Sequence, residues 1–165
     1  MSYHPWKGDF SYSRNTSLEK ATSDWILWTD ADDIITEDNC EKVREVKDGY
    51  DLNCCFSFII KNSLDGILGT VFNQIRMFPR DQRIRFRNKV HEQVLPSLQE
   101  VGYKTHFTDI MVLHTGYSDP EVVKRKQTRN MQILKGQMVK AVEMLDQAME
   151  IRLGRKPELS ERVGI

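Results

Sequence analysis

The sequence predicts an α/β fold that is followed by a long C-terminal helix, on three observations. Before residue 118, short apolar runs bounded by turn residues alternate with helix-compatible runs. One apolar run, residues 25–28, ends in a group of acidic residues. This is typical of a buried strand that delivers side chains to a ligand site at the edge of an open sheet. From about residue 120 the pattern changes to one sustained helical period.

Composition excludes several classes of protein. Of 165 residues, 39% are hydrophobic and 29% are charged, which suits one globular domain. The 24 basic residues balance the 24 acidic ones, so we expect no nucleic-acid partner. No stretch approaches the roughly 20 apolar residues of a transmembrane segment, and the first residues lack a secretory signal. We therefore expect a cytoplasmic protein.

The first elements are a helix, a strand and a second helix. Residues 15–23 are compatible with a short helix, with Asn15 as its N-cap, and the apolar strand follows. Thr36 is predicted to cap the next helix, which runs to about Lys47 and is ended by Gly49.

The middle of the chain is predicted to be rich in strands. Strands are expected at residues 52–61, 70–78, 84–95 and 109–114. Extended backbone over residues 83–89 would place four basic side chains on one face, those of Arg83, Arg85, Arg87 and Lys89. That face is interpreted either as solvated surface or as a surface that contacts a ligand.

Cysteine and tryptophan residues are expected to be structural. Cys40, Cys54 and Cys55 show no metal-site spacing, and adjacent residues of a strand point to opposite faces, so we expect reduced thiols. Trp25 and Trp28 lie in the apolar strand and are predicted to be core residues, although stacking on a sugar or base is the alternative.

The C-terminal part, residues 119–153, is predicted to be a long amphipathic helix with Asp119 as N-cap. Its apolar stripe consists of Met131, Leu134, Met138, Val142, Leu145 and Met149. This stripe, or an open sheet edge, favours a homodimer. The basic residues around Lys126 are expected to face solvent, and residues 154–165 to form a flexible tail.

The acidic group is the most informative feature. Asp30, Asp32 and Asp33 lie within four residues, and their charges repel unless a cation or hydrogen-bond donors compensate them. A short acidic turn of this kind suits Mn²⁺ or Mg²⁺, which accepts one or two carboxylates and fills its other positions with water and phosphate oxygens. An acidic N-capping loop is the alternative interpretation.

Several blocks surround this group. They are DFSYSRNTSL at residues 9–18, DWILWTDADD at 24–33, MFPR at 77–80, VHEQV at 90–94 and VLHTGY at 112–117. Together they resemble glycosyltransferase family 2, in the branch that includes peptide glycosyltransferases and tetratricopeptide-linked members. The resemblance implies a nucleotide-diphosphosugar transferase core, which is Rossmann-like with a mixed sheet.

The resemblance also implies that residues 1–118 are the C-terminal part of a catalytic domain. Family members begin with a βαβ half that binds the nucleobase, and their D-x-D motif lies further from the start, so we expect an N-terminally truncated member. A non-catalytic interaction or dimerisation module derived from such an enzyme is the alternative function.

In the family, such a site binds a nucleotide-diphosphosugar donor and a divalent cation. Carried onto this sequence, the metal ligands are Asp32, Asp30 and His114, and the donor contacts are Arg14, Asn15 and Asp30. A structural histidine and a surface arginine are the alternatives for His114 and Arg14.

The acceptor side is implied by the VHEQV block. Glu92 is the candidate general base of an inverting displacement, and His91 is its rival, while Asp33 is expected to support the ligands. The acceptor can be a saccharide, a peptide or a lipid-linked group.

Overall fold

The computed structural model describes residues 4–64, 67–115 and 120–153. The chain divides into two compact units, residues 1–126 and 127–165. The first unit contains the sheet, three complete helices and the start of a fourth. The described part of the second unit is the continuation of one long helix, α4 (Pro120–Leu153).

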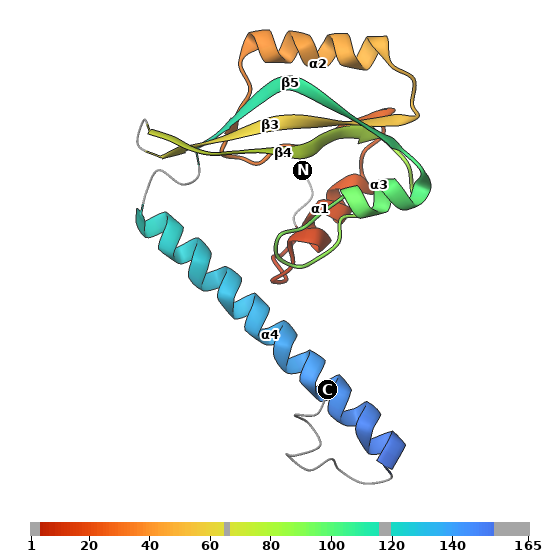
Figure 1. Cartoon of the computed structure of the whole chain (residues 1–165), viewed down its shortest axis with the longest axis vertical. Helices are drawn as coiled ribbons and strands as arrows, with labels where there is room; N and C mark the ends of the chain where they lie inside the picture. Colours follow the sequence, from red (N-terminus) through yellow and green to blue (C-terminus); the bar gives the residue numbers. More distant parts are fainter. Residues whose placement is uncertain (1–3, 65–66, 116–119, 154–165) are drawn as a thin grey trace. The chain divides into compact units, whose positions relative to one another are not determined.

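A mixed sheet forms the centre of the first unit (Figure 1). Its strands are β1 (Trp25–Leu27), β2 (Asp33–Ile34), β3 (Cys54–Leu64), β4 (Ile67–Pro79) and β5 (Lys104–His114). Their order across the sheet is β1-β4-β3-β5-β2. The β3–β5 pair is parallel and the other pairs are antiparallel. The predicted class, an α/β fold with a partial Rossmann-like mixed sheet and a long C-terminal helix, is confirmed.

Helices cover both faces of the sheet (Figure 1). On one face, α2 (Glu37–Gly49) contributes Val43 and Val46 to a core of strand residues. The opposite face carries α1 (Phe10–Leu18) and α3 (Leu95–Val101), whose apolar side chains pack on a second core. The first core contains Cys54, Phe56, Phe58, Ile60, Met77, Ile110 and Val112. The second contains Ile26, Trp28, Cys55, Ile75, Phe78, Ile84, Phe86, Val94 and Leu98.

The two adjacent cysteines point to opposite faces of the sheet, as predicted, and so lie in different cores. Cys54 belongs to the core under α2 and Cys55 to the core on the other face. Both are free thiols, and burial raises the pKa of each. Trp28 is buried and Trp25 packs against the α2 core, so the prediction that both are core residues is confirmed.

The first helix begins earlier than predicted. Asp9, not Asn15, is the N-cap of α1, because its carboxylate accepts a hydrogen bond from the Tyr12 amide at 2.9 Å. Asn15 therefore lies inside the helix, where its side chain faces another segment of the chain.

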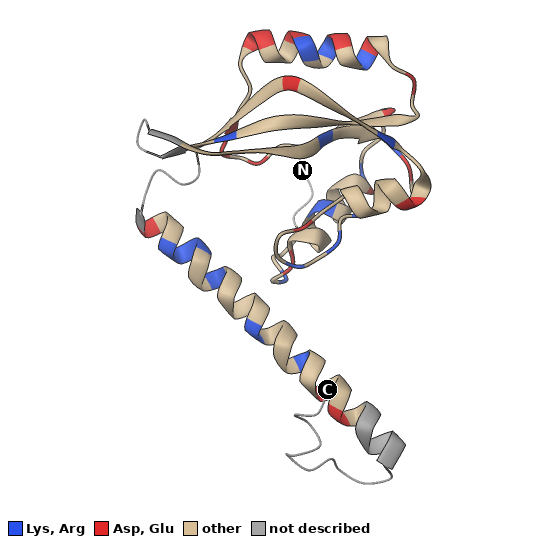
Figure 2. Cartoon of the chain, viewed as in Figure 1, with Lys and Arg blue, Asp and Glu red and all other residues tan. Residues whose placement is uncertain are grey.

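The second helix agrees with the prediction. Thr36 is its N-cap residue and the helix ends at Gly49. Acidic and basic residues are interspersed along this helix (Figure 2). Asn39 links the helix to β5, because its Oδ1 accepts from the Met111 amide at 2.8 Å. Its Nδ2 donates to Thr36 Oγ1 at 2.7 Å, within the start of the helix.

The prediction of a strand at residues 84–95 is wrong. This segment is irregular apart from one isolated bridge between Arg87 and Gln93. Positive φ angles at Asn88 (73°) and His91 (56°) break the extended path. The helix α3 then begins at Leu95, where the prediction had the end of the strand.

The basic strand face disappears with that strand. Arg83 pairs with Asp81 at 2.6 Å, and Arg87 pairs with Glu100. Arg85 donates to the carbonyl of Gln82 at 2.7 Å. These side chains thus stabilise the irregular segment.

The long helix forms as predicted, although Asp119 and the 154–165 tail lie outside the described residues. Five members of the apolar stripe are exposed, namely Met131, Leu134, Met138, Val142 and Leu145, and the side chain of Met149 is not among those described. In the described part of the chain, none of the helices combines the length and apolarity that crossing a membrane requires.

Candidate functional site

The acidic residues and the predicted histidine meet at one end of the sheet. Asp30 and Asp32 lie in the loop between β1 and β2, and Asp33 opens β2. Because β2 pairs with the end of β5, Asp33 faces His114 across the ladder. One ligand atom from each of these four residues lies within 4.8 Å of the others.

Asp33 is the buried centre of this group, with 0% of its side chain exposed. Its Oδ2 accepts from Arg76 Nη1 at 2.9 Å and from the Asp30 amide at 2.8 Å. Its Oδ1 lies 2.9 Å from Nδ1 of His114, and because an ionised carboxylate only accepts, Nδ1 donates. These contacts fix the Asp33 carboxylate and orient the imidazole.

Asp32 is the more accessible carboxylate, with 34% of its side chain exposed. Its backbone carbonyl accepts hydrogen bonds from the amide and the hydroxyl of Thr115, at 2.9 and 3.0 Å. Its Oδ2 lies 3.1 Å from Nζ of Lys126. The expectation that the Lys126 side chain is simply solvated is therefore wrong. Burial opposes ionisation of Asp32, but Lys126 and His114 outweigh burial and lower its pKa.

Arg14 joins the acidic group to the predicted base. Its Nη2 lies 2.7 Å from Asp30 Oδ1, and its Nε lies 2.7 Å from Glu92 Oε1. The guanidinium lies over the Trp28 ring, 4.0 Å from its centroid. All three charged side chains are at least partly buried, so Arg14 is a bridging residue and not a surface ion pair.

Two other predicted site residues, Asn15 and His91, do not hydrogen-bond to the acidic group. Asn15 uses its whole amide on the backbone of Phe86, because Nδ2 donates to the carbonyl at 2.9 Å and Oδ1 accepts from the amide at 2.8 Å. This holds the segment that leads to Glu92. His91 is exposed, whereas Glu92 is turned toward Arg14.

The geometry fits a hard divalent cation. Asp30 and Asp32 are each about one third exposed and offer the carboxylate oxygens that Mg²⁺ and Mn²⁺ prefer. The His114 ring faces the same group, because its Nδ1 lies 2.9 Å from Asp33 Oδ1 and 3.5 Å from Asp32 Oδ1. Asp33 is enclosed by Arg76, His114 and the Asp30 amide.

Sequence reasoning missed Arg76. This residue lies in β4 between Ile75 and Met77, and it is 2% exposed. Its sequence signal is a single basic residue inside an apolar strand, a pattern whose burial requires a charged partner.

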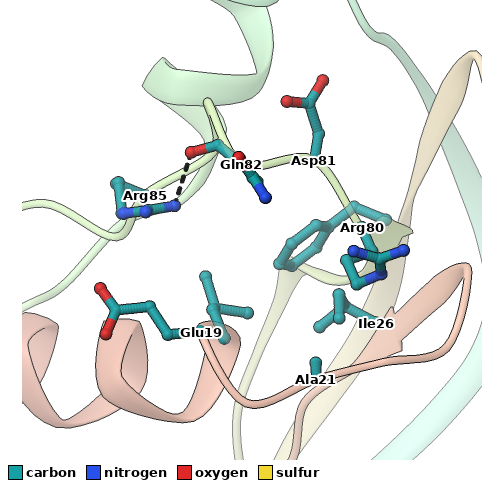
Figure 3. A pocket seen from close by; sticks show the side chains of 9 residues that line it. Glu19, Ala21, Ile26, Arg80, Asp81, Gln82 and Arg85 are labelled. Atoms are coloured by element: carbon teal, nitrogen blue, oxygen red, sulfur yellow. Dashed lines mark hydrogen bonds between the residues drawn. The ribbon is translucent and has the colours of Figure 1, made fainter.

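Two clefts border β1. One has a volume of about 550 Å³ and is lined by Arg14, Trp28 and Thr29 among others, so it adjoins the acidic group. The other, of about 340 Å³, is shown in Figure 3. Its lining includes Ile26 and Arg80 but none of the predicted site residues. The first cleft is therefore the space next to the candidate site.

The D-x-D cluster and His114 lie together at one end of an α/β sheet, where ligands of open sheets bind, and the sequence blocks around them resemble those of a glycosyltransferase. Comparison with known families supports this class, because residues 2–97 match the family described as glycosyl transferase family 2. The chain belongs to that family.

Curated relatives agree with the assignment. The chain is 30% identical over 138 residues to the SPbeta prophage-derived glycosyltransferase SunS of Bacillus subtilis and to glycosyltransferase SunS of Bacillus phage SPbeta. It is 28% identical over 133 residues to a TPR repeat-containing protein of Synechococcus elongatus. These matches cover 81%, 81% and 76% of the chain, and the chain spans 32% of the length of each relative.

Proposed function

We propose that this chain provides the metal-binding and acceptor side of a metal-dependent, inverting glycosyltransferase. The enzyme transfers a sugar from a nucleotide-diphosphosugar to an acceptor hydroxyl or other nucleophile, on a saccharide, a peptide or a lipid-linked group. In this proposal residues 1–118 belong to the catalytic domain. The observation that carries it is the approach of Asp30, Asp32 and His114 to one point, connected by Arg14 to Glu92.

On the donor side, Asp32, Asp30 and His114 would hold Mn²⁺ or Mg²⁺. When bound, the cation offsets the charge that the leaving nucleoside diphosphate develops. Arg14 offers planar N–H donors beside the cleft at Trp28, where they can contact phosphate oxygens. Asn15 contributes to the donor site by holding the Phe86 backbone, and a direct contact of Asn15 with the donor stays a prediction.

On the acceptor side, Glu92 is the proposed general base. As the acceptor oxygen bonds to the anomeric carbon and the bond from that carbon to the diphosphate breaks, Glu92 takes the acceptor proton. Arg14 holds one of its carboxylate oxygens, Oε1, at 2.7 Å, which leaves Oε2 to face the acceptor. His91, the alternative base, is exposed and lies beyond this network.

The test is calorimetric titration of the purified chain with Mn²⁺ and a panel of nucleoside diphosphates, beside Asp32→Ala. We expect metal and diphosphate to bind together in the parent chain and the substitution to abolish both. An exposed acidic control, Asp109→Ala, should bind as the parent does. A folded parent chain that binds neither metal nor diphosphate contradicts the proposal.

The alternative function, an interaction module, has its own supporting observation. Apolar side chains of α4 between residues 131 and 145 are exposed, which favours a homodimer through this helix. Light scattering after size exclusion tests it, with Leu134→Glu expected to give a monomer. A dimer that is indifferent to Mn²⁺, in a chain without nucleotide binding, would favour this module over the enzyme.

The proposed location of the protein is the cytoplasm. Its three cysteines are free thiols, which suits a compartment that keeps thiols reduced.

A further inference from the structure

A buried arginine lies behind the acidic group. Arg76 is in β4, which pairs with β1 on one side and β3 on the other. The side chain is 2% exposed, and burial lowers its pKa against the opposing effect of Asp33 and Asp30. A charge this far from water must have a definite set of partners.

The partners of Arg76 are two carboxylates of the site, the ring of Trp28 and the Trp28 carbonyl oxygen, which accepts from Nη1 at 3.4 Å. Nη1 lies 2.9 Å from Asp33 Oδ2, and Nη2 lies 3.7 Å from Asp30 Oδ2. The guanidinium carbon is 3.9 Å from the centroid of the Trp28 ring. Trp28 is itself held, because its indole N–H donates to the Ile75 carbonyl at 2.9 Å. The guanidinium plane is therefore fixed by a ring that cannot turn freely.

This arrangement uses the shape of arginine as well as its charge. The two terminal nitrogens of a guanidinium have a fixed separation and direction, and each one reaches a different carboxylate. A lysine ammonium at the same place has the same charge but a single nitrogen. One nitrogen of this forked group thus holds Asp33 by a short ion pair, and the other attracts Asp30 across 3.7 Å. Asp33 in turn accepts from His114 and orients its ring.

We propose that Arg76 is a positioning residue, which spaces the Asp30 and Asp33 carboxylates and, through Asp33, aims the His114 imidazole at the cation site. This rests on the proposed function, because His114 and Asp30 are ligands only if that site binds a cation. Arg76 touches neither the donor nor the cation in this role.

A competing role for Arg76 is that of a simple counter-charge. The two roles predict opposite results. If only the charge matters, Arg76→Lys binds Mn²⁺ as the parent does, and Arg76→Met binds it more tightly because a positive charge has left the site. If the fork positions the ligands, Arg76→Lys already weakens binding, in the range of about 10- to 100-fold that is typical when a residue supporting a metal ligand is lost.

The first measurement is Mn²⁺ binding to the full chain, from the electron paramagnetic resonance signal of the free ion. Arg76→Lys and Arg76→Met are compared with Arg44→Lys, a control at an exposed arginine of α2. We expect weaker binding by at least about tenfold in both Arg76 variants and no change in the control. Unchanged binding in a folded Arg76→Lys variant overturns the proposal.

A second measurement needs no metal, so it separates failure of this proposal from failure of the proposed function. The ring ¹⁵N and ¹H resonances of His114 report the hydrogen bond from Nδ1 to Asp33. We expect the resonance of the hydrogen-bonded Nδ1 proton in the parent and in Arg44→Lys, and we expect it to be lost in Arg76→Lys. If the parent binds no Mn²⁺, the proposed function fails and the His114 spectrum alone decides the role of Arg76. An unchanged spectrum in Arg76→Lys refutes it.

Discussion

Replacing Asp33 by asparagine removes one charge from a buried pair while keeping nearly the same shape. The carboxylate is 0% exposed and the guanidinium of Arg76 is 2% exposed, and they are 2.9 Å apart. Asparagine can still accept one hydrogen bond, from the Asp30 amide or from His114. The substitution leaves the buried charge of Arg76 with Asp30, at 3.7 Å, as its nearest ionic partner.

The size of the effect follows from this geometry. Breaking a buried ion pair by removing one partner costs about 3–5 kcal/mol, because the other charge stays buried. Since Asp30 continues to compensate Arg76 in part, we take the lower end, about 3 kcal/mol of unfolding free energy. With a urea m-value of about 2 kcal/mol/M, the unfolding midpoint should fall by about 1.5 M.

Urea unfolding followed by circular dichroism measures this midpoint. The matched control is Asp109→Asn, because Asp109 pairs with Lys42 on the surface and its side chain is 78% exposed. Such surface pairs contribute about 0–1 kcal/mol, so the control should move the midpoint by less than about 0.5 M. If Asp33→Asn moves it no further than the control, the assumption that Arg76 needs a buried counter-charge is refuted.

Two further outcomes are expected. A hydrogen bond from Arg83 lowers the pKa of Asp81 in the folded protein. The stability that this carboxylate contributes is therefore complete above the pKa of an ordinary Asp, near pH 4, and it is lost as the pH falls toward the lower pKa of the folded state. The difference in urea midpoint between the parent and Asp81→Asn should therefore shrink below about pH 4. Burial raises the pKa of Cys54 and Cys55, so mass spectrometry after iodoacetamide at neutral pH should find Cys40 labelled first; equal labelling would contradict it.

Elements with local signals could be predicted from the sequence. Thr36 precedes a helix that ends at Gly49, and α4 begins at Pro120, because boundary residues and helical periodicity are local signals. The Thr36 side chain itself makes no capping hydrogen bond. The approach of His114 to the acidic group is implied by the family resemblance of the VLHTGY block, and the structure brings these residues together.

Elements determined by distant contacts could not be predicted. Residues 84–95 alternate like a strand, but the Asn15 amide, 71 residues away, binds the Phe86 backbone in place of a neighbouring strand. Asn88 and His91 then adopt positive φ, which neither residue type reveals in advance. Arg76 was missed for the same kind of reason, because its partners Asp30 and Asp33 are far from it in sequence.

The two-residue strand β2 gives the site a dynamic property. Asp33 and Ile34 pair only with the end of β5, and Asp33 lies opposite His114 in that register. So short an edge ladder opens by local fluctuations at a much lower free energy than the long β3–β4 pair. Each opening separates the carboxylate from the imidazole, so assembly of the site and closure of the sheet edge are one event. Amide exchange at Ile34 would therefore follow the fraction of time that the site is assembled.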